Sequence, residues 1–98
     1  MYDDNQILIP ESFMALFMEP GRSKPTAPYP TILERYELCE DMANMLTGHA
    51  TTKMWELGVE KQDVVQRIHQ GLMESDAAVS APEAQWVALR LSELLGST

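Results

Sequence analysis

The sequence predicts an all-α protein: a small bundle of about four helices with an extended N-terminal arm and a proline-rich loop. Apolar residues recur at helical spacing, capping residues separate the periodic stretches, and no apolar run has a clear partner strand. Amphipathic helices this short cannot each bury an apolar face alone, so they must pack on one another. With 98 residues, the chain is expected to be a single helical domain over 1–98.

The N-terminal third is predicted to be an arm over 1–9, a short helix over 10–18 and a loop over 19–30. The arm begins acidic and continues into Ile7-Leu8-Ile9. Proline suits the first turn of a helix, and Pro10 starts a stretch that is apolar on most sides. The loop contains four of the six prolines: Pro20, Pro25, Pro28 and Pro30. Whether the arm and first helix belong to the core or reach out to a partner stays open.

The longest helix is predicted over 31–57, with Thr31 as its N-cap and Gly58 at its C-terminal cap. Gly48 weakens the middle, so the sequence leaves open whether this helix is continuous. Its apolar stripe has steps of three and four: Ile32, Tyr36, Cys39, Ala43, Leu46, Ala50, Met54 and Leu57.

Two further helices are predicted over 60–74 and 81–95. The second has the clearest start, because Ser80 precedes Glu83 by three residues, as in a capping box, with Pro82 in the first turn. The buried faces are expected to be Val64, Val65, Ile68 and Leu72 in the former and Ala84, Val87, Leu91, Leu94 and Leu95 in the latter.

Charge and composition restrict the class of partner. The formal net charge is −8, from 15 acidic and 7 basic residues, which argues against binding of duplex nucleic acid or of an anionic membrane surface. The single cysteine, Cys39, is typical of a reducing compartment, and we expect it to be buried. The acidic N-terminus is unlike a secretory signal, and no run approaches the roughly 20 apolar residues of a membrane span, so we expect a cytoplasmic protein.

The motifs of catalysis, cofactor binding and metal binding are not found in the sequence. Gly21-Arg22-Ser23-Lys24 lacks the first glycine, the spacing and the preceding strand of a phosphate-binding loop. One cysteine with His49 and His69, both expected near the surface, does not make a zinc set. We interpret Glu37, Glu40 and Asp41 as a solvated helix face. We therefore assign no catalytic, cofactor-binding or metal-binding residue.

Protein binding has more support. Seven methionines are many for this length, and methionine fills irregular cores or lines adaptable binding grooves, two roles that stay open here. Arg22-x-x-Pro25-x-x-Pro28 matches a ligand pattern of SH3 domains, and residues 25–28 spell a motif that recruits endosomal sorting proteins; a rigid linker is the favoured interpretation of both. The candidate partner-binding residues are Phe13, Phe17, Met18, Met42 and Met45.

Residues 35–43, Arg-Tyr-Glu-Leu-Cys-Glu-Asp-Met-Ala, and residues 9–13, Ile-Pro-Glu-Ser-Phe, resemble a family of small uncharacterised proteins from β-proteobacteria and their relatives. Members are sometimes labelled as ATPases with chaperone activity. The resemblance implies a bacterial cytoplasmic setting and transfers no catalytic residue.

These observations favour a non-enzymatic helical module that binds another protein, or an accessory protein. One alternative, taken from the resemblance, is an ATP-dependent chaperone-type accessory. Another is a structural homodimer in which the long helix pairs with its copy.

Overall fold

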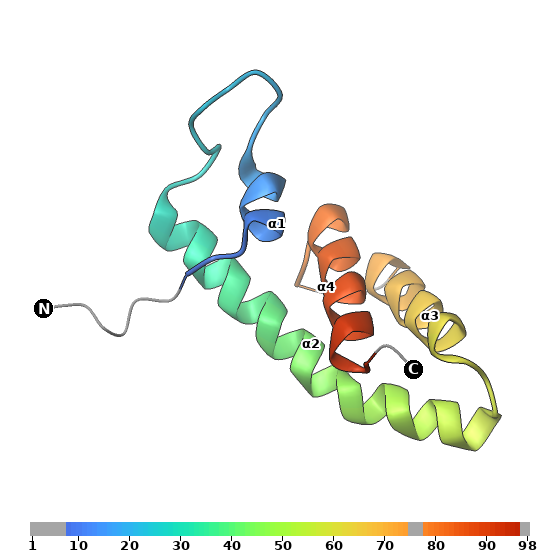
Figure 1. Cartoon of the computed structure of the whole chain (residues 1–98). Coiled ribbons are helices and arrows are strands. Elements are labelled where there is room, and N and C mark those ends of the chain that lie inside the picture. The colour runs from blue at the N-terminus through green and yellow to red at the C-terminus, as the bar shows by residue number, and fades with distance from the viewer. Residues whose placement is uncertain (1–7, 75–77, 97–98) are drawn as a thin grey trace, which may run out of the picture. The chain divides into compact units, whose positions relative to one another are not determined.

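The computed structural model describes residues 8–74 and 78–96 and confirms the all-α class (Figure 1). Along the chain come α1 (Glu11–Met14), the 3-10 helix η1 (Ala15–Phe17), α2 (Tyr29–Leu57), α3 (Lys61–Glu74) and α4 (Ala81–Leu94). The only β-type pairing among the described residues is an isolated antiparallel bridge between Met18 and Pro25. No helix in the described ranges has both the length and the apolar character needed to cross a membrane.

The sequence predicts one domain, and the contacts of the chain group into two compact units, Met1–Glu37 and Leu38–Thr98. The first unit includes α1, η1 and the start of α2. The second includes the rest of α2 together with α3 and α4.

The first unit is organised around the ring of Phe13, which is fully buried. Its centroid lies 5.6 Å from the ring of Phe17 and 5.6 Å from that of Tyr36, the second pair meeting edge to face. Such tilted aromatic pairs stabilise beyond the area that they bury. Of the predicted arm, Ile7 lies outside the described residues, and Leu8, in no regular structure, is 85% exposed.

The first helix is shorter than the predicted 10–18. Only four residues are α-helical, and the 3-10 turn that follows ends at Phe17, because Met18 adopts an extended conformation (φ −117°, ψ 134°) and pairs with Pro25. The backbone N–H of Thr26 donates to the Phe17 carbonyl at 2.6 Å. The proline-rich loop therefore folds back, and its Thr26 N–H occupies the Phe17 carbonyl, which a longer helix would use for a hydrogen bond of its own.

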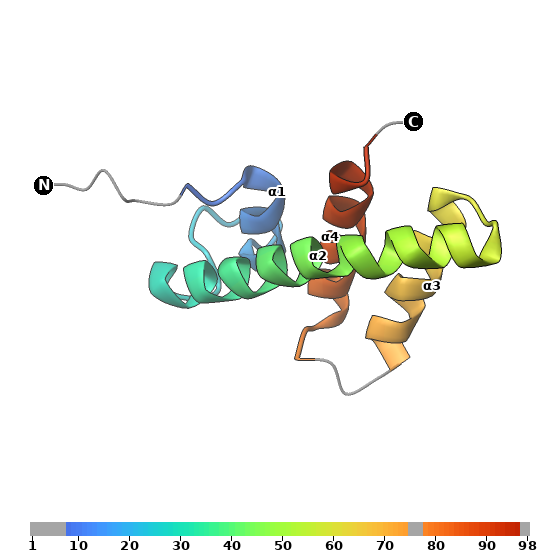
Figure 2. The same cartoon turned by 90° about the horizontal axis from the view of Figure 1, so that it is seen from below.

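α2 is one helix of 29 residues, about 43 Å long at 1.5 Å per residue, and it does not break at Gly48 (Figure 2). The alanines on either side of that glycine, Ala43 and Ala50, are both fully buried, so packing outweighs the weak helix propensity of glycine. The helix begins two residues earlier than predicted, with Pro30 in its first turn and Thr31 inside the helix. Proline needs no N–H there, and the Ile32 N–H donates to the Pro28 carbonyl at 3.1 Å.

The core of the second unit is formed by three helices. α3 and α4 lie side by side in both views, and both rest against the part of α2 that follows residue 38 (Figures 1 and 2). Ala50, Val64 and Leu91, one from each helix, form its buried centre. Further apolar side chains pack around them: Leu46, Met54, Val59, Val65, Ile68 and Leu95.

The predicted caps of the second unit are confirmed. The Glu83 N–H donates to the Ser80 hydroxyl at 3.3 Å, and the Ser80 N–H donates to the Glu83 carboxylate at 2.8 Å, which completes a capping box at the start of α4. Glu83 is only 4% exposed. Gly58 ends α2 with φ +65°, and its N–H donates to the Met54 carbonyl at 2.9 Å.

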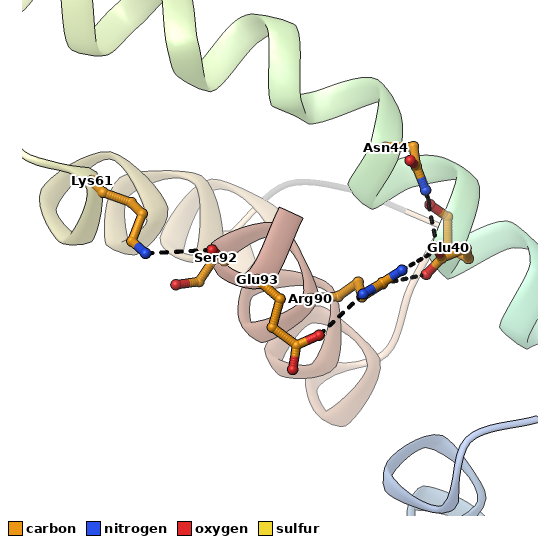
Figure 3. Close-up of polar contacts among 6 residues, drawn as sticks. All are labelled: Glu40, Asn44, Lys61, Arg90, Ser92 and Glu93. Atoms are coloured by element: carbon orange, nitrogen blue, oxygen red, sulfur yellow. Dashed lines mark hydrogen bonds and ion pairs between the residues drawn. The ribbon is translucent and has the colours of Figure 1, made fainter. Parts of the chain in front are cut away.

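Polar contacts tie α4 to both of its neighbours (Figure 3). Arg90 donates to both carboxylate oxygens of Glu40 on α2, from Nε at 2.8 Å and from Nη2 at 2.9 Å. Lys61 at the start of α3 donates to the carbonyls of Ser92, at 3.5 Å, and Gly96. A cation at the carbonyl end of a helix is favourable, so the ammonium group of Lys61 stabilises the C-terminal end of α4.

Candidate functional site

The five residues predicted to bind a partner do not form one exposed surface. Phe13 is fully buried in the first unit, so of the two roles that the sequence left open for the first helix, core or partner contact, this ring has the core role. Phe17, Met18 and Met42 are half-buried. Met45, on α2, is 73% exposed and is the one of the five that is available to a partner over most of its surface.

The residues considered for chemistry also separate. Cys39 is fully buried, as predicted. His49 is exposed, whereas His69, predicted near the surface, is half-buried, and its Nε2 atom is enclosed without a hydrogen-bond partner among the described residues. Glu40 does not belong to a solvated face, because it is half-buried and paired with Arg90. Within the described ranges, no three His, Cys, Asp or Glu side chains come together as a metal site.

An open groove of about 540 Å³ lies between α2 and α3, entirely within the second unit. We call it the α2–α3 groove. Both helices contribute residues at steps of three and four, which is the spacing of one helix face. Its apolar lining consists of Leu46, Leu57, Val64, Ile68 and Leu72, and its other lining residues are His49, Lys53, Arg67 and Gly71.

The polar side chains of the groove are all basic in type. His49 and Lys53 come from α2 and Arg67 from α3, and none of the described residues that line the groove is acidic. Lys53 pairs with Glu56 at 3.7 Å, but both side chains are about half exposed, so solvent weakens this pair. Arg67 makes no ion pair or hydrogen bond with the described residues. Although the chain has a net charge of −8, the α2–α3 groove therefore combines basic side chains with an apolar lining.

Gly71 keeps the groove open on the α3 side. A Cβ atom built at this position would meet nothing within 4 Å, so space for at least a methyl group is unfilled there. Glycine inside a helix costs about 0.5–1 kcal/mol relative to alanine. Leu57 at the other wall is 52% exposed, which leaves apolar surface in contact with water.

A second surface runs along the outer side of α2. It consists of Met45, Gly48, Thr52 and Trp55, at steps of three, four and three, and we call it the outer strip. All four are exposed, Trp55 at 88%. Residues 42–52 contain no charged side chain. The outer strip shares no residue with the α2–α3 groove.

Trp55 was not among the predicted binding residues, although the sequence contains a signal for it. Trp55 follows Met54, a member of the buried stripe, by one residue, and one residue is a rotation of about 100° around the helix. A helical projection of the residues outside the stripe would have placed it on the same side as Gly48, about 20° away around the helix. The groove had no comparable signal, because Lys53 and Arg67 belong to different helices.

A scan against models of protein families, a search of curated proteins and a search of solved structures each gave no match to this chain.

Proposed function

We propose that this chain is a non-enzymatic protein-interaction module, and that its α2–α3 groove binds an amphipathic helix with acidic flanks from another protein. The observation that carries the proposal is the apolar groove with three basic side chains in a chain of net charge −8. The bacterial cytoplasmic setting that the family resemblance implies stays part of this proposal.

The shape of the groove favours a helix as the occupant. Two helices already form its walls, and a third helix can lay residues spaced by three and four along such a groove. The lining offers apolar side chains along α2 and along α3, from Leu46 to Leu57 and from Val64 to Leu72. An open groove of this form fits an elongated apolar face better than a compact polar molecule.

The charges of the groove favour acidic flanks on that helix. Arg67 donates to none of the described residues, and a guanidinium binds a carboxylate through two parallel hydrogen bonds. Lys53 lies across the groove on α2 and would serve a carboxylate on the other flank. The net charge of −8 repels an acidic partner at long range, but over the roughly 8 Å of the Debye length at physiological salt the nearby cations dominate.

The alternative of an ATP-dependent accessory has less support in these side chains. Phosphate-binding loops converge several free backbone N–H groups on the ligand. The only glycine of the groove, Gly71, lies inside α3, where backbone N–H groups serve the helix itself. We therefore expect no saturable binding of ATP.

The proposal can be tested by titrating the labelled protein with a designed helical peptide that has leucines at steps of three and four and glutamates on both flanks. Backbone amide shifts should change saturably at groove residues such as Leu46, Ile68 and Leu72. Replacing the peptide glutamates with lysine should abolish the effect. Millimolar ATP in place of the peptide should leave the same signals unchanged.

Two matched variants locate the site. Gly71→Leu fills the open space of the groove and should weaken peptide binding at least tenfold, and its helix should be at least as stable because leucine is the better helix former. Gly48→Leu makes the same change on the outer strip and should bind as the wild type does. Absence of saturable shifts with the acidic peptide, or equal binding by Gly71→Leu and wild type, would refute the proposal.

A further inference from the structure

We infer that the outer strip of α2 pairs with the outer strip of a second copy of this chain, the two helices running antiparallel. This goes beyond the proposed function, because the strip and the α2–α3 groove have no residue in common. The occupant is a second copy because the middle of the strip has no charge that would repel its copy. In addition, the large and small side chains of the two strips fall opposite one another in an antiparallel pair.

The strip exposes two large apolar side chains to water. Trp55 is 88% exposed and Met45 is 73% exposed, one helical turn beyond each end of a segment with small side chains. Aromatic residues dominate the energetics of interfaces, and tryptophan is among the most enriched there. Covering these two side chains is therefore the main gain that pairing would bring.

Charge decides which face a second copy can approach. Two chains of net charge −8 repel each other, so a face of contact must be one where few charges meet. Residues 42–52 have no charged side chain, whereas the same side of α2 nearer its start has Glu34, Glu37 and Asp41. A parallel pair would place Asp41 beside Asp41. An antiparallel pair with its axis level with residue 50 overlaps only residues 43–57, whose charged side chains are Lys53 and Glu56, and it keeps Asp41 and the acids before it outside the overlap.

Side-chain size fits the same arrangement. With a two-fold axis level with residue 50, Met45 of one copy lies opposite Trp55 of the other, and Gly48 lies opposite Thr52. A Cβ atom at Gly48 would meet nothing within 4 Å, so the backbones can approach closely in the middle. Methionine sulfur makes favourable contacts with aromatic rings, and here one such contact would form on each side of the axis.

The area predicts a weak dimer. A tryptophan side chain buries about 150–250 Å². Two copies of Trp55 and two of Met45 would supply most of the area buried in the pair. We therefore expect the interface to be smaller than the roughly 1,200 Å² at which stable complexes begin. We therefore expect exchange between monomer and dimer as concentration changes, and two α2–α3 grooves in each dimer. Two linked sites bind a partner with two matching helices more tightly than one site can.

Sedimentation of the full chain across a concentration series tests the pairing. The wild type should shift from monomer toward dimer as concentration rises to the millimolar range. Trp55→Ala should raise the dissociation constant at least tenfold, whereas Leu89→Ala, which removes a 62% exposed leucine from α4, should leave it within twofold. A wild-type chain that stays monomeric throughout, or a dimer that Trp55→Ala does not weaken, would overturn the inference.

The centre of the paired surface is tested at Thr51, which flanks the strip. In the antiparallel pair Thr51 lies one residue from the two-fold axis, so the two copies of it are about 3 Å apart along the helix axes. Thr51→Lys alone and Thr51→Glu alone should each weaken the dimer, and an equimolar mixture of the two variants should restore it. A mixture no tighter than the separate variants would overturn the pairing. In a parallel pair the two copies of residue 45 would face each other, whereas in the antiparallel pair they lie about 15 Å apart along the helix axes. Oxidation of Met45→Cys chains to a disulfide-linked dimer would therefore overturn the antiparallel direction. Peptide binding by Trp55→Ala reports on the groove separately.

Discussion

Removal of the Glu40–Arg90 ion pair should weaken the second unit by an amount that depends on pH. The two side chains meet through two hydrogen bonds of 2.8 and 2.9 Å and join α2 to α4, positions separated by 50 residues. Buried charge-assisted hydrogen bonds contribute about 1.5–3 kcal/mol, and exposed ion pairs about 0–1 kcal/mol. These side chains are 22% and 33% exposed, so we expect a coupling free energy of about 1–1.5 kcal/mol at pH 7.

A double-mutant cycle measures this coupling. Glu40→Gln, Arg90→Met and the double variant are unfolded in urea, and the cycle removes the separate contacts of Glu40 with Asn44 and of Arg90 with Glu93. As a control, the pair of Glu19 and Arg22 is 3.8 Å apart with side chains 60% and 72% exposed, and it should show no measurable coupling.

The pH dependence follows from the pKa of Glu40. Hydrogen bonds from Arg90 have the largest effect and lower the pKa of this carboxyl. Partial burial raises the pKa, and a hydrogen bond from Asn44 lowers it again, so that in the folded protein it lies below its ordinary 4.5. A lowered folded-state pKa contributes stability that is present above pH 4.5 and is lost as the pH falls through the folded value. The coupling should therefore be constant from pH 7 to about pH 5 and should disappear in stronger acid. A coupling under about 0.3 kcal/mol at pH 7, or one that persists unchanged at pH 2, would refute this reasoning.

Three further predictions concern single residues. Gly48→Ala and Gly71→Ala should each raise the free energy of unfolding by about 0.5–1 kcal/mol, since both positions are helical and have room for a methyl group. Gly58→Ala should lower the free energy of unfolding by about 1 kcal/mol, because Gly58 has φ +65°. Equal effects at the three sites in thermal unfolding would contradict this. Cys39 should react slowly with a thiol reagent in the folded state, and Cys39→Ala should cost on the order of 1 kcal/mol; rapid labelling would show that the thiol is accessible. Ser80→Ala should cost about 1 kcal/mol in urea unfolding, and a neutral result would mean that the capping box does not stabilise α4.

The sequence predicted best the features that depend on neighbouring residues. The capping box of Ser80 and Glu83 is such a feature, and the predicted helix over 81–95 differs from α4 by one residue. The continuity of α2 through Gly48 depends on burial of alanines in the three-dimensional core, which local propensity does not report. The early end of the first helix likewise depends on a bridge to Pro25, seven residues further along the chain.

The candidate surfaces were only partly accessible from the sequence. Met45 was identified as a candidate, and its 73% exposure agrees with a role in binding. The sequence left the role of Phe13 open, because an aromatic residue in an apolar stretch can equally be a core residue or an anchor. Its burial and its contacts with Phe17 and Tyr36 show that it is a core residue. The α2–α3 groove requires the relative placement of two helices, so no single stretch of sequence encodes it.

The contact of Lys61 with the end of α4 has a consequence for the order of folding. The carbonyl oxygens of Ser92 and Gly96 lie at the end of α4, where carbonyls lack a partner within the helix, and their donor comes from the first residue of α3. The last turn of α4 therefore gains its full stability only when the first turn of α3 is in place. In native-state hydrogen exchange, amides of these two turns should open together as one cooperative unit, although more than thirty residues separate them along the chain.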